Sequence, residues 1–239
     1  MAENLALRLD ADSAPLVLGE VMVALGDSIA AGIGAGHVTE GCMWLLANRL
    51  RSLRPDVEFH HLAVPSESST SMLAPGGQLE RAEELLADAA ARGRTVGPIT
   101  LSIGGNDILE AGLIGDDEAL RQLEENLATI LRRLDDALRP GGQRIAEVAV
   151  VQTVYNPFEA LPVGHADSMA PLRASRSGYN AAIRRVAQNM GVRLCDLSSL
   201  FRGRILELTW VGTGDIHPSG AGHQLIAAEL FRVGGWDIG

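Results

Sequence analysis

Three polar residues that together could perform nucleophilic catalysis occur far apart in the chain: Ser28, Asn106 and His217. Acyl transfer from an ester requires a nucleophile, a base that removes its proton, and hydrogen-bond donors for the oxyanion that forms. A serine, a histidine and an asparagine can fill these three roles. They can act together only if the fold brings them to one place, so the elements that precede them decide the question.

Ser28 follows the apolar run 21–25 and the pair Gly26-Asp27. A short apolar run that ends at a glycine predicts a buried central strand of a parallel sheet. Ligands bind beyond the carboxyl ends of such strands, and the amide groups at a helix start favour developing negative charge. This position favours Ser28 as a nucleophile. The alternative interpretation is that Ser28 caps a helix, a common role of serine.

The stretch Asp215-Ile216-His217-Pro218 favours His217 as the base. Pro218 biases the residue before it toward extended backbone, where side chains two residues apart point to the same side. Asp215 can then hold the tautomer of the His217 ring and stabilise its protonated form. The alternative is an Asp215 that binds loop amides beside an ordinary loop histidine. For the remaining histidines we favour structural roles: His37, His60, His61, His165 and His223.

Asn106 follows two glycines, Gly104 and Gly105, at the end of a predicted strand. The glycines permit close backbone approach, and a side-chain amide there can donate to an oxyanion. The alternative is a turn in which Asn106 and Asp107 bond their own backbone. A metal site formed by Asp215, His217 and His223 has only weak support from its spacing, because no cysteine or carboxylate cluster accompanies it. We therefore expect no metal and no cofactor.

Strands and helices are predicted to alternate along the whole chain. The apolar runs predict five strands, over 21–25, 57–64, 99–103, 145–154 and 192–196, and helical spacing predicts helices over 43–53, 79–91, 120–138, 179–190 and 220–231. The glycine-rich segment 29–36 lacks the dinucleotide-binding spacing and is predicted to be a mobile loop that lines a pocket. This alternation is typical of an α/β fold with a parallel sheet and helices on both faces. We expect one domain over 1–239, with 1–18 peripheral.

Composition excludes several classes of function. The net charge of -10 argues against nucleic acid and against stable association with an anionic membrane. All 20 basic residues are arginine, which rules out a lysine base or Schiff base. Cys42 and Cys195 are expected to be buried free thiols. The sequence contains neither a signal-peptide core nor an apolar run long enough to cross a membrane, so we expect a cytoplasmic protein.

The chain resembles the SGNH hydrolases, also called the GDSL esterases and lipases. Gly26-Asp27-Ser28 is similar to the first block of that family, Gly104 to Asp107 to the third, and Asp215 to Pro218 to the last, so the resemblance extends from Leu25 to His223. It implies a flavodoxin-like three-layer fold and serine hydrolysis of esters without a metal or organic cofactor. It also implies that Ser28 is the nucleophile, that His217 is the base, and that the Ser28 amide and the Asn106 side chain donate to the oxyanion.

The sequence departs from the family pattern at three positions. Ile29 stands where the family name has leucine, and Ser66 stands where the second block offers a glycine amide to the oxyanion hole. The family's acid commonly lies three residues before the histidine, where this chain has Gly214, whereas Asp215 lies two before. Either Asp215 or a main-chain carbonyl is therefore expected to orient the ring of His217.

The expected partner is a small-molecule ester. The loop 155–171 is predicted to overhang the pocket and to supply an apolar wall, with Phe158, Leu161, Val163 and Met169. We expect Asp27, Gly105, Tyr155 and Phe158 to line the substrate pocket. An apolar wall favours small or acyl esters. The alternatives are a carbohydrate O-deacetylase, a lysophospholipase or thioesterase of the same family, and a non-catalytic binding module on the same fold. The sequence does not indicate an oligomeric state.

Overall fold

A computed structural model describes residues 14–114, 116–160 and 170–237. Its central sheet contains five strands: β1 Val21–Gly26, β2 Glu58–His61, β3 Val96–Ser102, β4 Ala149–Gln152 and β5 Arg193–Cys195. All four strand pairings are parallel, and the order across the sheet is β2-β1-β3-β4-β5. The predicted five-stranded parallel α/β fold is confirmed.

This strand order places a topological switch point between β1 and β3. From β1 the chain moves to one edge of the sheet for β2, and it returns to the other side of β1 for β3. In open α/β sheets the crevice at such a point, beyond the carboxyl ends of the strands, is the usual ligand site. Ser28 follows β1 and Asn106 follows β3, so both lie beside this crevice.

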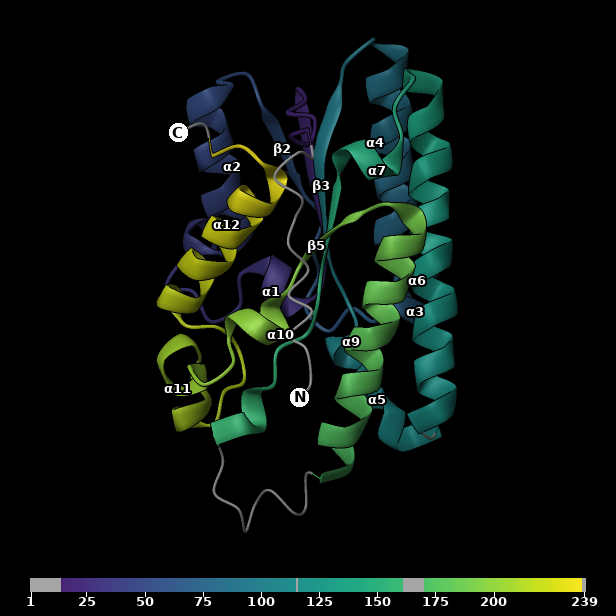
Figure 1. Ribbon diagram of the computed structural model, residues 1–239. Helices are drawn as coiled ribbons and strands as arrows, with labels where there is room; N and C mark the ends of the chain where they lie inside the picture. Colours follow the sequence, from purple (N-terminus) through teal and green to yellow (C-terminus); the bar gives the residue numbers. More distant parts are fainter. Residues whose placement is uncertain (1–13, 115, 161–169, 238–239) are drawn as a thin grey trace.

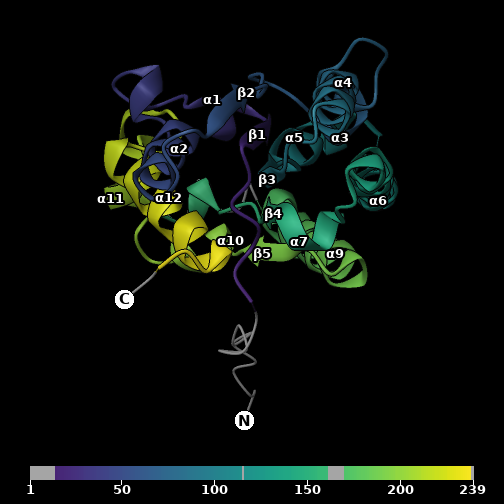
Figure 2. The ribbon, with the colours of Figure 1, turned by 90° about the horizontal axis from the view of Figure 1, so that it is seen from above.

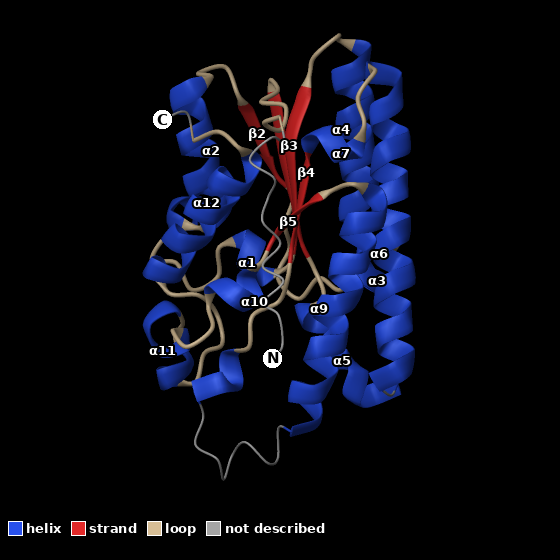
Figure 3. Cartoon of the chain, viewed as in Figure 1, coloured by secondary structure: helices blue, strands red, loops and turns tan. Residues whose placement is uncertain are grey.

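Two layers of helices cover the sheet, and each buries its own apolar core (Figures 1 and 3). One layer contains α3 Ser69–Met72, α4 Gln78–Ala91, α5 Gly105–Ile114, α6 Asp116–Leu138, α7 Ile145–Val148 and α9 Ala170–Met190. The other contains α1 Ser28–Ala31, α2 Cys42–Leu53, α10 Leu197–Leu200, α11 Ile205–Leu208 and α12 Gly220–Gly234. Figure 2 shows the sheet between these layers in the view from above. Four short 3₁₀ turns complete the described elements: η1 Val38–Glu40, η2 Arg139–Gly141, η3 Pro157–Ala160 and η4 Val211–Thr213.

The apolar patterns explain both the burial of the strands and the packing of the long helices. All six residues of β1 are buried, as expected for a central strand covered on both faces. The leucines of α6 form one stripe that packs into the core of its layer. No helix in the described ranges is long and apolar enough to cross a bilayer.

Three predicted segments are wrong in detail, and the first is the predicted strand 57–64, of which only Glu58–His61 pair in the sheet. The predicted strand 145–154 begins as the helical turn α7, and only Ala149–Gln152 pair in the sheet. The Glu147 carboxylate accepts from the Arg144 amide at 2.9 Å, which stabilises the start of that turn in place of a strand. The predicted loop 29–36 is also partly helical, because its first three residues belong to α1.

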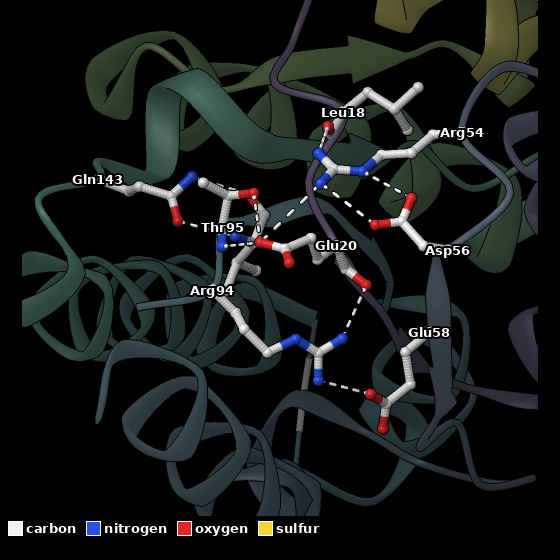
Figure 4. A network of polar contacts seen from close by, with 9 residues as sticks. Leu18, Glu20, Arg54, Asp56, Glu58, Arg94, Thr95 and Gln143 are labelled. Atoms are coloured by element: carbon white, nitrogen blue, oxygen red, sulfur yellow. Dashed lines mark hydrogen bonds and ion pairs between the residues drawn. The ribbon is translucent and has the colours of Figure 1, made fainter. Parts of the chain in front are cut away.

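A polar network covers the amino-terminal ends of the strands, opposite the switch point (Figure 4). Arg54 donates to the Leu18 carbonyl at 2.9 Å and to the Asp56 carboxylate at 3.1 Å. Arg94 donates to the Glu58 carboxylate at 2.6 Å and to the Glu20 carbonyl at 3.2 Å. These two arginines therefore join the segments that enter β1, β2 and β3, and they lie away from the carboxyl ends where ligands bind.

Candidate active site

The end of β1 presents Ser28 at the start of a helix. Gly26 has a φ of 134°, and a Cβ at this position would lie 2.2 Å from the Ser102 carbonyl oxygen, so only glycine permits the turn. Asp27 then caps α1, because its carboxylate accepts from the Ile29 amide at 3.0 Å. Ser28 is the first residue of the helix, so the alternative interpretation of Ser28 as the cap is wrong.

Asp27, which precedes Ser28, is almost fully buried. Its carboxylate accepts from the Ser102 hydroxyl at 3.1 Å as well as from the backbone of α1. Burial raises the pKa of Asp27 to about 6, although these hydrogen bonds favour the ionised form. The Asp27 carboxylate, whose charge is costly to bury, therefore stabilises the turn on which Ser28 lies through these hydrogen bonds.

Ser28, His217 and Asp215 form one chain of hydrogen bonds, although 189 residues separate the first two. The Nε2 atom of His217 lies 2.9 Å from Ser28 Oγ, and Nδ1 lies 2.6 Å from Asp215 Oδ1. The same carboxylate oxygen accepts from the His217 amide at 3.0 Å. Hydrogen bonds from this amide and from the ring lower the pKa of Asp215, so its carboxylate remains ionised beside the imidazole.

Tyr155 holds the backbone between Asp215 and His217. Its hydroxyl donates to the carbonyl of Ile216 at 2.6 Å, and its ring stacks on Phe201 with the centroids 4.5 Å apart. The backbone of Ile216, the residue between Asp215 and His217, is thus held by Tyr155. The Asp215 carboxylate, two residues before the histidine, is the group that lies beside Nδ1 of the ring.

Asn106 and Asp107, at the start of α5, join this helix to the segment after β2. The Asn106 amide donates to the Glu67 carbonyl at 2.8 Å, and Asp107 accepts from the Ser69 amide at 3.1 Å and from its hydroxyl. Both residues belong to a helix and bond another segment, so the turn of the alternative interpretation is wrong. Asn106 retains a second amide hydrogen, and its side chain lines the same cleft as Ser28.

Ser66 has the backbone geometry of a glycine. Its φ of 66° is the only positive value among the described non-glycine residues. Left-handed backbone is the conformation that glycine adopts without strain, which explains why a glycine suits this position. Within the described residues, the amides of Ser28 and Ser66 donate to no other protein group, so both remain available to an oxygen atom. Ser66 does not line the cleft itself, unlike Ser28 and Asn106.

A cleft that is open to solvent lies directly beside Ser28 and His217. The four residues expected to line the pocket all contribute to its wall: Asp27, Gly105, Tyr155 and Phe158. Ile29 and Pro157 also line it and belong to the two segments predicted to do so, whereas four apolar lining residues were not predicted: Ile108, Leu109, Val154 and Ile216. Each of these lies within three residues of a predicted site residue, and this proximity was the signal available for them. Leu161, Val163 and Met169, expected in the overhanging loop, lie outside the described residues.

The other described histidines make local structural contacts. His37 caps η1, His60 pairs with Glu58, and His61 bonds the Ala30 carbonyl at 2.8 Å. His223 is buried, and both its ring nitrogens bond backbone atoms of other segments. His165 lies outside the described residues. In the described part of the chain no three His, Cys, Asp or Glu side chains are grouped so as to hold a metal ion.

Solved structures with this fold include several esterases. The chain is similar to the lipase Lip_vut3 from a goat rumen metagenome, with 20% identity and a TM-score of 0.68, covering 90% of this chain and 97% of that one. It is similar to Axe2, an acetylxylan esterase from Geobacillus stearothermophilus, with 18% identity and a TM-score of 0.65, covering 93% and 97%. It is also similar to TesA, with 20% identity and a TM-score of 0.61, covering 89% and 97%. No curated protein matches the sequence. At these identities the similarity is one of fold.

The protein is a carboxylic ester hydrolase. This class follows from the parallel sheet, from the hydroxyl and imidazole at its switch point, and from the family that the sequence matches. The model of the GDSL-like lipase/acylhydrolase family matches residues 24–225, and the chain belongs to that family. The resemblance identified from the three sequence blocks is thus confirmed.

Proposed function

We propose that the protein is a serine esterase that cleaves small or acyl esters through a Ser28–His217–Asp215 triad and an acyl-enzyme intermediate. The observation that carries this proposal is the chain of hydrogen bonds from Ser28 Oγ through the His217 ring to Asp215, with distances of 2.9 and 2.6 Å, at the wall of an apolar cleft. A nucleophile, a base and an orienting carboxylate in this relation are the requirements of acyl transfer.

The mechanism has two steps. His217 Nε2 takes the proton of Ser28 Oγ as this oxygen bonds to the ester carbonyl carbon, and the protonated ring then gives the proton to the leaving alcohol. Water, deprotonated by the same ring, attacks the acyl-enzyme and releases the carboxylic acid and free Ser28. We assign the oxyanion contacts to the backbone amides of Ser28 and Ser66 and to the Asn106 side chain.

The apolar lining of the cleft favours the acyl group as the part of the substrate that binds there. Ile108, Leu109, Val154 and Phe158 provide apolar side chains along its wall, and no arginine is among the lining residues that the structure describes. Apolar walls favour uncharged acyl groups, because a charged group would lose its hydration there without a partner. Among the solved structures of this fold, Axe2 is an acetylxylan esterase, so acetylated sugars belong in the same substrate test.

A fluorophosphonate probe tests the proposal at the level of the nucleophile. The probe should label the wild-type protein, and the modified peptide should contain Ser28. Ser28→Ala should abolish labelling and lower turnover by about a million-fold. A non-catalytic binding module would not react at Ser28, and a metal-dependent hydrolase would lose activity to a chelator while resisting the probe. An active Ser28→Ala protein would end the proposal.

Rates on p-nitrophenyl esters of graded chain length, compared with rates on an acetylated xylo-oligosaccharide, define the substrate class. We expect the value of kcat/KM to rise from acetate to at least butyrate, because each methylene buried in the cleft contributes about 0.8 kcal/mol. A preference for the acetylated sugar over all simple esters would favour the deacetylase alternative.

A further inference from the structure

Two ring N–H groups on either side of His217 bind consecutive carbonyls of one loop. The Trp210 indole donates to the Gly34 carbonyl at 2.8 Å, and His223 Nε2 lies 3.0 Å from the Ile33 carbonyl. The loop belongs to the nucleophile segment, since the Ile33 amide donates to the Ser28 carbonyl at 2.9 Å. These two bonds therefore join the segment of Ser28 to the segment of His217.

The hydrogen bonds of His223 define its tautomer. Its Nδ1 atom accepts from the Cys42 amide at 3.2 Å, so the proton of the neutral ring is on Nε2, which donates to Ile33. The ring is completely buried, and burial lowers the pKa of His223. His223 therefore remains a neutral donor, and it does not compete with His217 for the proton of the nucleophile.

Trp210 also holds the backbone that carries the base. Its amide donates to the His217 carbonyl at 3.0 Å, and its own carbonyl accepts from the Asp215 amide at 3.2 Å. The indole ring reaches from this point to Gly34 while remaining 45% exposed. One residue thus contacts the segment of the acid and base through its backbone and the segment of the nucleophile through its side chain.

Gly34 permits the two segments to touch. Its φ is 93°, and a Cβ built there would lie 2.2 Å from the Pro218 carbonyl oxygen and 3.0 Å from His217 Cβ. A backbone carbonyl cannot yield as the tip of a flexible side chain can. The loop after α1 is therefore packed against the catalytic histidine itself, and any larger residue at position 34 must push the two segments apart.

We propose that Trp210 and His223, bound to the carbonyls of Gly34 and Ile33, form a clasp that sets the distance between Ser28 Oγ and His217 Nε2. Both are positioning residues, since neither is among the residues that line the cleft. The inference rests on the proposed esterase function. It accounts for two hydrogen bonds that join segments 176 and 190 residues apart beside the proposed catalytic pair.

Gly34→Ala tests the clasp by separating its two segments. We expect kcat to fall on the order of ten- to a hundred-fold with KM changed less than two-fold, because the change displaces the base from the nucleophile but leaves the cleft intact. Fluorophosphonate labelling of Ser28 should slow by the same factor. Gly36→Ala is the matched control, because a Cβ there meets only the flexible tip of Glu40, and it should retain wild-type rates.

Trp210→Phe removes the indole donor at a half-exposed position and supplies a second test that is independent of folding strain at Gly34. It should lower kcat and the labelling rate with an unchanged KM. Trp44→Phe is its control, because the Trp44 indole N–H is buried and has no partner among the described residues.

At His223, asparagine can accept from Cys42 but is too short to reach Ile33, whereas glutamine can donate to Ile33. His223→Gln should therefore retain more activity than His223→Asn.

The results separate this inference from the esterase proposal. If the wild-type protein neither hydrolyses esters nor reacts with the probe, the esterase proposal itself fails. If the wild-type protein reacts and folded Gly34→Ala and Trp210→Phe proteins react at the same rate, the clasp is overturned while the esterase proposal stands. Loss of substrate binding with an unchanged kcat would also overturn it, because a clasp acts on the distance between nucleophile and base.

Discussion

Replacement of Asp27 by asparagine should stabilise the protein at neutral and alkaline pH. The carboxylate of Asp27 is only 3% exposed, and burial raises its pKa from 3.8 to about 6. Since each pH unit between these values corresponds to about 1.4 kcal/mol, the ionised group costs the folded state about 3 kcal/mol at pH 8. Asparagine carries no charge, and it still offers an oxygen to the Ile29 amide and the Ser102 hydroxyl.

The sign of the pH dependence follows from proton binding. Between pH 3.8 and 6 the folded protein binds the Asp27 proton more tightly than the unfolded chain does, so the wild-type protein gains stability from this group as the pH falls. The asparagine variant has no such proton to bind and does not gain this stability. Its advantage should therefore shrink from about 3 kcal/mol at pH 8 to about 1.5 kcal/mol at pH 5, and nearly vanish below pH 4.

Urea unfolding of both proteins at pH 8, 6, 5 and 4 measures this difference directly. Asp135→Asn is a control of opposite sign: Asp135 is also buried, but hydrogen bonds from Arg144, the Ile145 amide and Arg139 outweigh its desolvation and lower its pKa to about 2. That variant should lose stability at pH 8 and approach the wild-type protein as the pH falls. An Asp27→Asn protein that is less stable than wild type at pH 8, or whose advantage does not change with pH, would refute the reasoning.

Three further changes test other parts of the site and the core. Asp215→Asn should lower kcat for a p-nitrophenyl ester by roughly 10⁴-fold, because the ring loses the group that fixes its tautomer; a loss below ten-fold would assign that role to a main-chain carbonyl. Asn106→Ala should lower kcat about a hundred- to a thousand-fold with little change in KM, and an unchanged kcat would remove Asn106 from the oxyanion contacts. Gln152→Met should raise the free energy of unfolding by at least about 1 kcal/mol in urea, because both polar atoms of the buried Gln152 amide lack a partner among the described residues; a loss of stability would show that the amide is satisfied.

Much of the arrangement could be predicted from local patterns. An apolar run that ends in Gly26-Asp27-Ser28 indicates both a buried strand and the edge of the sheet at which Ser28 lies. Parallel strands bring their carboxyl ends to that same edge, so Asn106 could be placed near Ser28 without knowledge of the strand order. Periodicity likewise predicts the long helix α6 through its leucine stripe.

The missed features depend on hydrogen bonds, burial and backbone angles that the residue types alone do not report. The helical turn α7 forms because Glu147 and Asp135 satisfy amides that a strand would have paired. The raised pKa of Asp27 is a consequence of burial, which no local pattern reports. The positive φ of Ser66 also has no signal in its own residue type, since serine seldom adopts it.

The proposed triad combines one distance that local sequence sets with one that the packing of distant segments sets. The pair Asp215 and His217 is local, because one carboxylate oxygen of Asp215 accepts from both the amide and the ring of His217 two residues further on. The distance between Ser28 Oγ and His217 Nε2 instead joins residues 189 positions apart. Only contacts between those two segments can maintain this distance. The carbonyls of Ile33 and Gly34 make such contacts, because they are bound by residues on both sides of His217 in the sequence. A small displacement there should therefore change the rate of catalysis and leave substrate binding unaltered.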